Sequence, residues 1–252
     1  MTALRQGSLL QVRDLDKSFG GVHAVRGVSF DVQEGEILGV IGPNGSGKST
    51  LFNCILGQLT PNRGTVTVDG RDVTGLRPSQ LNRLGVSRTF QLLQVFPQLT
   101  ARENLIAAAQ EHQGSRWARL FGARDAGLGL AADRMLDFFR LTSLAGKKAG
   151  NLSYGQQKLL DAAMAFMAGS RLVLLDEPAG GVNPTMLAGL RERLAEINRE
   201  RRATFVVIEH NMEFVMALCT RLIVLAEGRI IAEGAPDTVR RDSAVIEAYL
   251  GH

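Results

Sequence analysis

The first part of the chain consists of short apolar runs separated by turns that contain glycine or aspartate. Within these runs, apolar residues either alternate with polar ones or continue for four or five positions, and both patterns are typical of β-strands. We therefore predict strands at residues 9–12, 28–32, 37–41, 65–68 and 86–90. After the third strand, apolar residues at 51, 55 and 56 share one face of a predicted helix.

From residue 92 to about residue 169, helical periodicity replaces the strand pattern. Thr100 and Glu103 have the spacing of a capping box at the start of one helix. Two further helices are predicted around residues 135–139 and over 154–167. This middle segment therefore predicts a helical insertion.

Strands and helices alternate again beyond residue 170. Two fully apolar runs predict buried strands, two amphipathic segments predict helices, and Glu227-Gly228 predicts the turn of a hairpin. The predicted strands are residues 172–175, 204–208, 222–225 and 230–232, and the predicted helices are residues 184–200 and 212–218. The alternation predicts an α/β domain with a mainly parallel sheet.

Composition narrows the class of protein. The chain has 252 residues, of which 45% are hydrophobic and 21% charged, as in a folded domain with a substantial core. A net charge of +4 without a clustered basic patch does not indicate nucleic-acid binding, and we expect no nucleic-acid partner. Cys54 and Cys219 lie in apolar helical stretches and are expected to be buried thiols. Neither a signal-peptide pattern nor an apolar run of roughly 20 residues is present, so we expect a cytosolic protein unless a partner holds it at a membrane.

The most informative motif is a glycine-rich run that matches G-x-x-x-x-G-K-[ST] in full. It lies between a predicted strand and a predicted helix, where backbone N–H groups can point at a phosphate. Lys48 is placed to reach β- and γ-phosphates, and the Ser49 hydroxyl to ligate Mg²⁺. A glycine-rich turn without a ligand is the alternative, but the complete match in this context favours binding of a nucleoside triphosphate. The predicted binding residues are Gly42, Pro43, Asn44, Gly45, Ser46, Gly47, Lys48, Ser49 and Thr50.

A second motif places two carboxylates at the end of an apolar strand. Asp176 and Glu177 follow residues 172–175, at the strand edge where ligands bind in open α/β sheets. Asp176 is positioned to hold Mg²⁺, directly or through water. Strand alternation predicts that Glu177 points to the opposite face, where it can accept a proton from the attacking water.

Just upstream of this strand, Leu152-Ser153-Tyr154-Gly155-Gln156 resembles the L-S-G-G-Q signature of ATP-binding-cassette (ABC) transporter ATPases. Tyr154 stands in place of the first glycine, whereas Ser153 and Gly155 are kept. Ser153 and Gln156 also have capping-box spacing, and a capped helix N-terminus suits phosphate contact. The resemblance implies that Ser153, Gly155 and Gln156 contact the nucleotide of a second ATPase chain.

Further motifs of the family follow in the expected order. Gln91 resembles the Q-loop glutamine, with a role in catalysis and in Mg²⁺ binding, and His210 resembles the switch histidine. Phe19 resembles the aromatic residue that stacks on adenine, with Val25 nearby. Asn183 stands in the D-loop where aspartate is usual, and it is also a suitable N-cap ahead of Pro184. The resemblance thus implies an ATPase with Glu177, His210, Gln91 and Lys48 as catalytic residues.

The resemblance covers residues 8–250 as one ABC ATPase domain. It implies a P-loop NTPase core with an N-terminal antiparallel β subdomain and an inserted α-helical subdomain. We expect these parts at 8–91 (β and P-loop part), 92–169 (helical signature subdomain), 170–235 (second part of the core) and 236–252 (helical tail).

Several phrases are most similar to the ATPases of branched-chain amino-acid importers, among them Gly85-Val86-Ser87-Arg88-Thr89-Phe90-Gln91. That resemblance implies ATP and Mg²⁺ as ligands and a second ATPase chain, identical or paralogous. It also implies membrane permeases, a periplasmic solute-binding protein and a peripheral position on the cytoplasmic face of the inner membrane. An exporter ATPase, or an importer ATPase for urea or short amides, is the alternative. The transported solute is inferred only from the similarity of these short sequence segments.

Two segments keep alternative interpretations. Residues 113–130 combine arginines with Trp117 and Phe121, which suits lipid headgroups or nucleic acid, or an exposed insertion without a partner. Residues 92–99 are apolar and uncharged, and around Phe96 they either pack between the core and the helical subdomain or receive a permease helix.

Overall fold

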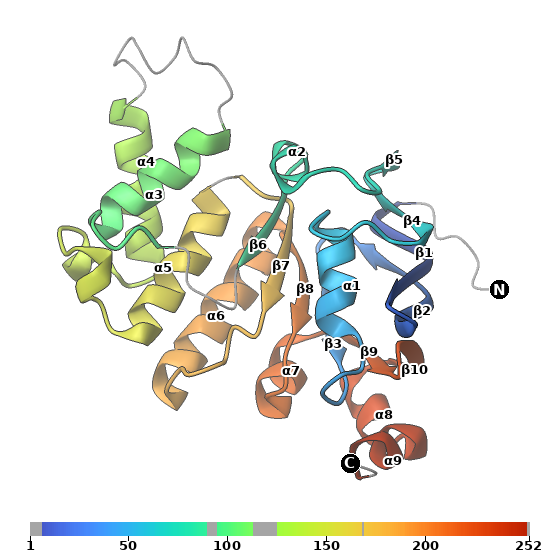
Figure 1. Ribbon diagram of the computed structural model, residues 1–252. Helices are drawn as coiled ribbons and strands as arrows, with labels where there is room; N and C mark the ends of the chain where they lie inside the picture. The colour runs from blue at the N-terminus through green and yellow to red at the C-terminus, as the bar shows by residue number, and fades with distance from the viewer. Residues whose placement is uncertain (1–6, 90–94, 113–124, 168, 251–252) are drawn as a thin grey trace.

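The computed structural model describes residues 7–89, 95–112, 125–167 and 169–250. Two sheets form its centre (Figure 1). The smaller sheet is antiparallel and has the strand order β2-β1-β4-β5, whose bounds are β1 Ser8–Phe19, β2 Val22–Gln33, β4 Arg63–Val68 and β5 Arg71–Asp72. The predicted N-terminal antiparallel β part is confirmed, with first strands much longer than their apolar runs indicated.

The larger sheet has the order β10-β9-β3-β8-β7-β6, and every neighbouring pair is parallel except β9 with β10. The strands are β3 Ile37–Ile41, β6 Val86–Thr89, β7 Leu172–Asp176, β8 Thr204–Ile208, β9 Arg221–Ala226 and β10 Arg229–Gly234. The mainly parallel sheet and the hairpin at Glu227-Gly228 are therefore confirmed. Phe90 and Gln91 lie outside the described residues.

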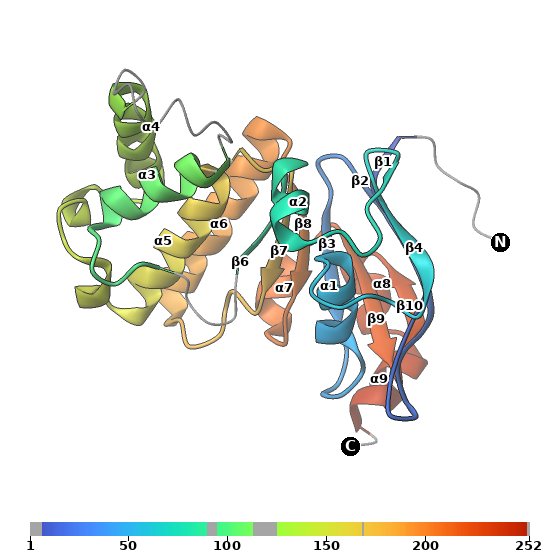
Figure 2. The same cartoon turned by 45° about the horizontal axis from the view of Figure 1, so that its top comes forward.

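Helices cover both faces of the larger sheet, and one of them, α1, lies between the two sheets (Figure 2). The α-helices are α1 Lys48–Ile55, α2 Pro78–Arg83, α3 Ala101–His112, α4 Asp125–Phe138, α5 Tyr154–Met167, α6 Pro184–Arg201, α7 Met212–Leu218, α8 Pro236–Arg240 and α9 Ser243–Leu250, with short 3₁₀ turns η1 Thr142–Leu144 and η2 Ala149–Asn151. None of the helices in the described parts of the chain is long and apolar enough to cross a bilayer. The predicted capping box is present: the Thr100 N–H donates to Glu103 Oε2 at 2.8 Å, and the Glu103 N–H to Thr100 Oγ1 at 3.2 Å.

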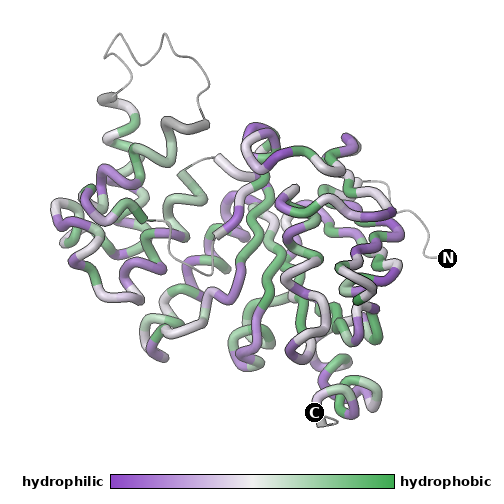
Figure 3. The backbone as a smooth tube through the Cα atoms, viewed as in Figure 1, coloured by the Kyte–Doolittle hydropathy of each residue, from purple (hydrophilic) through white to green (hydrophobic). Residues whose placement is uncertain are grey.

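The central strands are buried on both faces, which explains their continuous apolar runs (Figure 3). Side chains alternate between two hydrophobic clusters, as strand geometry requires. Leu174 and Val206 face a cluster that includes α1 and the small sheet. Val173 and Phe205 face the other cluster, which includes the helices of the middle segment. The helix α1 is thus packed between the two sheets.

The helical segment has no separate core of its own. Phe139, at the end of α4, stacks on Phe166 of α5 with ring centroids 6.2 Å apart. Phe166 in turn meets Phe205 of β8 edge to face at 5.7 Å. One continuous apolar cluster therefore joins the helices to the main sheet. Residues 125–130 of the predicted excursion are part of α4, and residues 113–124 lie outside the described chain.

Candidate nucleotide-binding and hydrolysis site

The glycine-rich loop joins β3 to α1, as its strand-turn-helix context predicted. Gly47 has φ 101°, and a Cβ at this position would lie 2.1 Å from the Ala24 carbonyl oxygen. Only glycine fits such a close approach. The loop is also bonded to its surroundings, since the Gly228 N–H donates to the Ser46 carbonyl at 3.0 Å and the Arg26 N–H to the Gly228 carbonyl at 2.8 Å. The loop is therefore held in shape by β2 and by the β9–β10 turn.

Lys48 begins α1, and its side chain folds back into the loop. Its ammonium donates to the carbonyl oxygens of Gly42 at 2.8 Å and Pro43 at 2.9 Å. Burial lowers the pKa of Lys48, while the Glu177 carboxylate acts in the opposite direction. The cation thus lies inside the loop and can exchange these carbonyls for phosphate oxygens. The first turn of α1 carries no acidic residue and no side-chain cap, so its N–H groups face no competing anion there.

Asp176 lies at the end of β7, on the face of the sheet covered by α1. Its Oδ2 is ion-paired with Arg88 of β6, and Oδ1 has no hydrogen-bond partner among the described residues. Ser49, the second residue of α1, is exposed. Mg²⁺ takes oxygen ligands, keeps several waters and needs only one or two protein ligands. A free carboxylate oxygen and an exposed hydroxyl fit this requirement, and Mg²⁺ bound there would neutralise charge developing on the transferred phosphate.

Arg88 is a site residue that the sequence argument missed. Besides Asp176, its guanidinium donates to Asn53 Oδ1 at 3.0 Å and Gln58 Oε1 at 2.7 Å, both at the end of the α1 region. Parallel pairing of Arg88 with Leu174 places both side chains on the α1 face. Arg88 therefore orients the carboxylate that the sequence assigned to Mg²⁺.

Glu177 does not continue the strand alternation that the sequence argument assumed. The strand β7 ends at Asp176, and Glu177 has φ 49°, in the left-handed region that non-glycine residues seldom adopt. Its Oε1 lies 2.9 Å from Nε2 of His210. The structure thus brings together the predicted general base and the predicted switch histidine, which come from the ends of neighbouring strands β7 and β8.

Glu209 stabilises the turns that carry Glu177 and His210, and it was not predicted from the sequence. It is 2% exposed, and its carboxylate accepts hydrogen bonds from the N–H groups of Ala179, His210 and Asn211. One buried carboxylate therefore fixes the turn after Glu177 and the turn that carries His210. Three N–H donors compensate its desolvation. The only signal for it in the sequence was an acidic residue directly before His210.

The predicted signature forms the start of α5. The Ser153 N–H donates to Gln156 Oε1 at 2.9 Å, and the Gln156 N–H to Ser153 Oγ at 3.4 Å, so the capping box is present. A Cβ at Gly155 would lie 2.7 Å from Met186 Sδ, so a larger side chain there would have to displace Met186. The Tyr154 ring lies against Gly181, where a Cβ would be 2.8 Å from Cε1. The substitution of Tyr for Gly in the signature is thus accommodated by a glycine in the D-loop.

A buried lysine connects the signature helix to the catalytic end of β7. The Lys158 ammonium donates to the Glu177 carbonyl at 3.3 Å and lies 5.7 Å from the centre of the Tyr154 ring. Lys158 is only 6% exposed. It was not singled out from the sequence, where it reads as one more polar residue of an amphipathic helix.

The signature and the glycine-rich loop do not meet within one chain. Helix α5 packs on the face of the main sheet opposite to α1, as their membership in different core clusters shows (Figures 1 and 2). Ser153 therefore cannot complete the site around Lys48 of its own chain.

The structure separates the two residues expected around adenine. Phe19, at the end of β1, is 45% exposed and lies under the Lys17 ammonium, 5.2 Å from the ring centre. Val25 is 1% exposed and belongs to the core, and its contact with the base stays a prediction. Gln91 lies outside the described residues. Asn183 caps α6 by accepting from the Met186 N–H at 2.9 Å, as predicted from Asn183-Pro184.

Comparison with protein families identifies the architecture. Residues 25–180 match the model of the ABC transporter family. The chain belongs to the ABC transporter family. As an ABC ATPase it hydrolyses ATP in support of transport. Residues 229–252 also match a model described as "Branched-chain amino acid ATP-binding cassette transporter".

Individual relatives agree with this placement. The ABC ATPase is 39% identical over 251 residues to "High-affinity branched-chain amino acid transport ATP-binding protein BraF" of Pseudomonas aeruginosa, covering 96% of this chain and 98% of that protein. It is 37% identical over 252 residues to the Escherichia coli protein LivG, covering 96% of this chain and 98% of that protein. Among solved structures, the ADP conformation of the ATP-binding cassette MJ1267 matches with a TM-score of 0.87 and 34% identity, over 97% of this chain and 99% of that one. The predicted fold is therefore confirmed.

Proposed function

We propose that this ABC ATPase powers a branched-chain amino-acid importer. The observation that carries the proposal is the match of residues 229–252 to the branched-chain amino-acid model, which lies outside the general ATPase match at 25–180. The similarity to BraF and LivG extends over 96% of the chain and supports the same solute class. ATP is the energy source, and Mg²⁺ bound by Ser49 and Asp176 is the accompanying ion.

Hydrolysis in this proposal takes place between two ATPase chains. One chain supplies Lys48, Ser49 and Asp176 around the phosphates, and Glu177 takes the proton of the attacking water while His210 contacts the γ-phosphate. The partner supplies Ser153 and Gly155, because in this structure they lie on the opposite face of the sheet from Lys48. A related cassette, MJ0796, is described as dimeric in a post-hydrolysis state with ADP and phosphate, at 25% identity and a TM-score of 0.77.

ATP closes the dimer and hydrolysis reopens it. Closure is passed to two membrane permeases, while a periplasmic protein delivers the solute. The ATPase therefore acts on the cytoplasmic face of the inner membrane, held there by the permeases. Phe96 is 51% exposed, and in this proposal it contacts the permeases together with the rest of segment 92–99, of which residues 92–94 lie outside the described residues.

The test is Glu177→Gln in the complete transporter. Replacing the base removes proton acceptance but leaves the phosphate contacts, so ATP binding persists and turnover falls roughly 10²–10⁴-fold. Leucine uptake should fall in parallel, and a nucleotide-bound dimer should accumulate on size-exclusion chromatography. Glu192→Gln, at an exposed position on α6, is the matched control and should behave as wild type. Normal hydrolysis by Glu177→Gln removes Glu177 from the base role, whereas lost hydrolysis with unchanged leucine uptake refutes the assigned solute.

A mixing experiment tests the shared site. Lys48→Ala inactivates the loop of one chain, and Ser153→Arg inactivates the signature of the other. Combining the two variants creates one intact site from their unchanged halves. Hydrolysis by the mixture that never exceeds that of either variant alone would contradict a site shared between two copies of this chain.

A further inference from the structure

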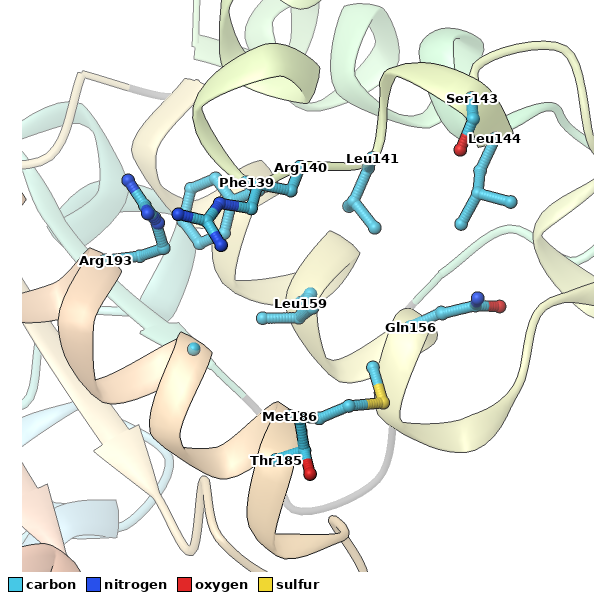
Figure 4. Close-up of a pocket in the computed structure, with 11 residues that line it drawn as sticks. Phe139, Arg140, Leu141, Ser143, Leu144, Gln156, Leu159, Thr185, Met186 and Arg193 are labelled. Atoms are coloured by element: carbon cyan, nitrogen blue, oxygen red, sulfur yellow. The ribbon is translucent and has the colours of Figure 1, made fainter.

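A pocket lies beside the signature helix, away from the glycine-rich loop. It is formed where the end of α4 and the turn η1 face the first halves of α5 and α6 (Figure 4). Its volume is about 280 Å³, close to the lower end of the range of about 300–1,000 Å³ for small-molecule sites. None of the predicted nucleotide contacts except Gln156 lines it. The pocket is therefore separate from the glycine-rich loop that is predicted to bind ATP.

One part of the pocket wall is apolar. Leu141 and Phe139 are each 2% exposed and form the floor toward the core. Leu144, Leu159 and Met186 complete the apolar surface. This apolar part of the lining suits a hydrocarbon chain.

Two guanidinium groups provide the charged part of the lining, and Ser143, Gln156 and Thr185 add uncharged polar groups. Arg140 and Arg193 both line the pocket, and Figure 4 shows their side chains toward the same end of it. The Arg140 guanidinium has no ion pair or hydrogen bond to any residue that the structure describes. Arg193 is held by Glu196 and lies 5.4 Å from the centre of the Phe138 ring, which leaves part of its donor set available. A guanidinium pair of this kind matches a carboxylate.

The lining contains no acidic side chain. An amine or an amino-acid ammonium would therefore enter a cationic site without a counter-ion, which is unfavourable. The combination of an aliphatic chamber, arginines and no carboxylate selects for a small anion with a hydrocarbon tail. We propose that this pocket binds an aliphatic monocarboxylate, with its carboxylate at Arg140 and Arg193 and its chain along Leu159 and Met186.

The position of the pocket gives such binding a consequence for the ATPase. Met186 packs against Gly155 of the signature, and Gln156 forms the signature capping box. A ligand bound there would contact the helical segment and α6 at once, and so would hold the signature helix in place relative to α6.

Gly189 offers a way to fill the pocket without disturbing its walls. It lies on α6 and lines the pocket, and no atom lies within 4 Å of where its Cβ would be. Gly189→Phe places a ring in the open space, and Gly189→Ala, which adds one methyl group, is the matched control. Arg140→Ala removes one cation and leaves the apolar lining residues unchanged.

The experiment measures binding of hexanoate to the full chain by calorimetry, with ADP binding as the check of folding. We expect saturable hexanoate binding that is retained in Gly189→Ala, lost in Gly189→Phe and weakened about tenfold or more in Arg140→Ala. Three analogues test the parts of the ligand: norleucine adds an ammonium group, hexanol lacks the carboxylate and acetate lacks the hydrocarbon tail. Each should bind at least about tenfold more weakly than hexanoate. Absence of saturable binding, equal binding of norleucine or hexanol, or undiminished binding to Gly189→Phe would each overturn the proposal.

Discussion

Replacement of Arg88 by methionine should be among the most damaging single changes to stability near the active site. The Arg88 side chain is 12% exposed and that of Asp176 is 4% exposed, so the ion pair is almost fully removed from water. Methionine keeps most of the hydrocarbon stem but leaves the Asp176 carboxylate without its partner. Breaking a buried pair in this way costs about 3–5 kcal/mol, which in a chain of this size lowers the melting temperature by roughly 6–20 °C.

Denaturant and thermal unfolding without nucleotide would measure the effect, because bound nucleotide would offset part of the loss. Arg171→Met is the matched control: its guanidinium pairs with Glu34 and Asp69 at the surface and is 50% exposed, so the cost should stay below about 1 kcal/mol. Adding Asp176→Asn to Arg88→Met removes the unpaired charge and should restore much of the stability. If Arg88→Met costs no more than Arg171→Met, the buried pair described here does not exist in solution.

Three further predictions concern the loop, the thiols and the apolar segment. Gly47→Ala should abolish ATP binding without unfolding the chain, because its methyl group would meet the Ala24 carbonyl oxygen at 2.1 Å; equilibrium dialysis that shows normal ATP affinity would contradict this geometry. Burial raises the pKa of Cys54 to about 11 and that of Cys219 to about 12, so at pH 8 thiolate fractions are on the order of 10⁻³ and 10⁻⁴. A thiol reagent should therefore label neither cysteine in the native protein and both after unfolding, and fast native labelling would show that one is accessible. Phe96→Glu should leave the melting temperature and basal hydrolysis unchanged and prevent co-purification with the permeases, whereas a sharp fall in melting temperature would make Phe96 a core residue.

Local patterns predicted most of the fold and the centre of the site. The glycine-rich loop, both capping boxes and the cap at Asn183 each depend on residues within a few positions of one another, so their geometry follows from the sequence directly. The two-face burial of β7 and β8 was likewise visible in their apolar runs.

Contacts between distant residues could not be predicted in the same way. The Arg88–Asp176 pair joins residues 88 positions apart, and it depends on the register of β6 against β7. Phe19 and Val25 are close in sequence, yet Phe19 is 45% exposed whereas Val25 is 1% exposed and lies in the core. For Glu177, strand alternation does not apply, because β7 ends at Asp176 and Glu177 has a left-handed φ of 49°.

The position of β3 in the middle of the main sheet has a consequence for biosynthesis. This strand delivers the glycine-rich loop, yet its hydrogen-bonded neighbours β8 and β9 are made near the end of translation. Gly35, at the turn before β3, bonds to Thr204, 169 residues further along the chain. At about 5–20 residues per second, the ribosome needs roughly 10–30 s to produce that partner. During this interval β3 presents a fully apolar strand with unpaired edges, so the nascent chain should depend on chaperones until its last third has emerged.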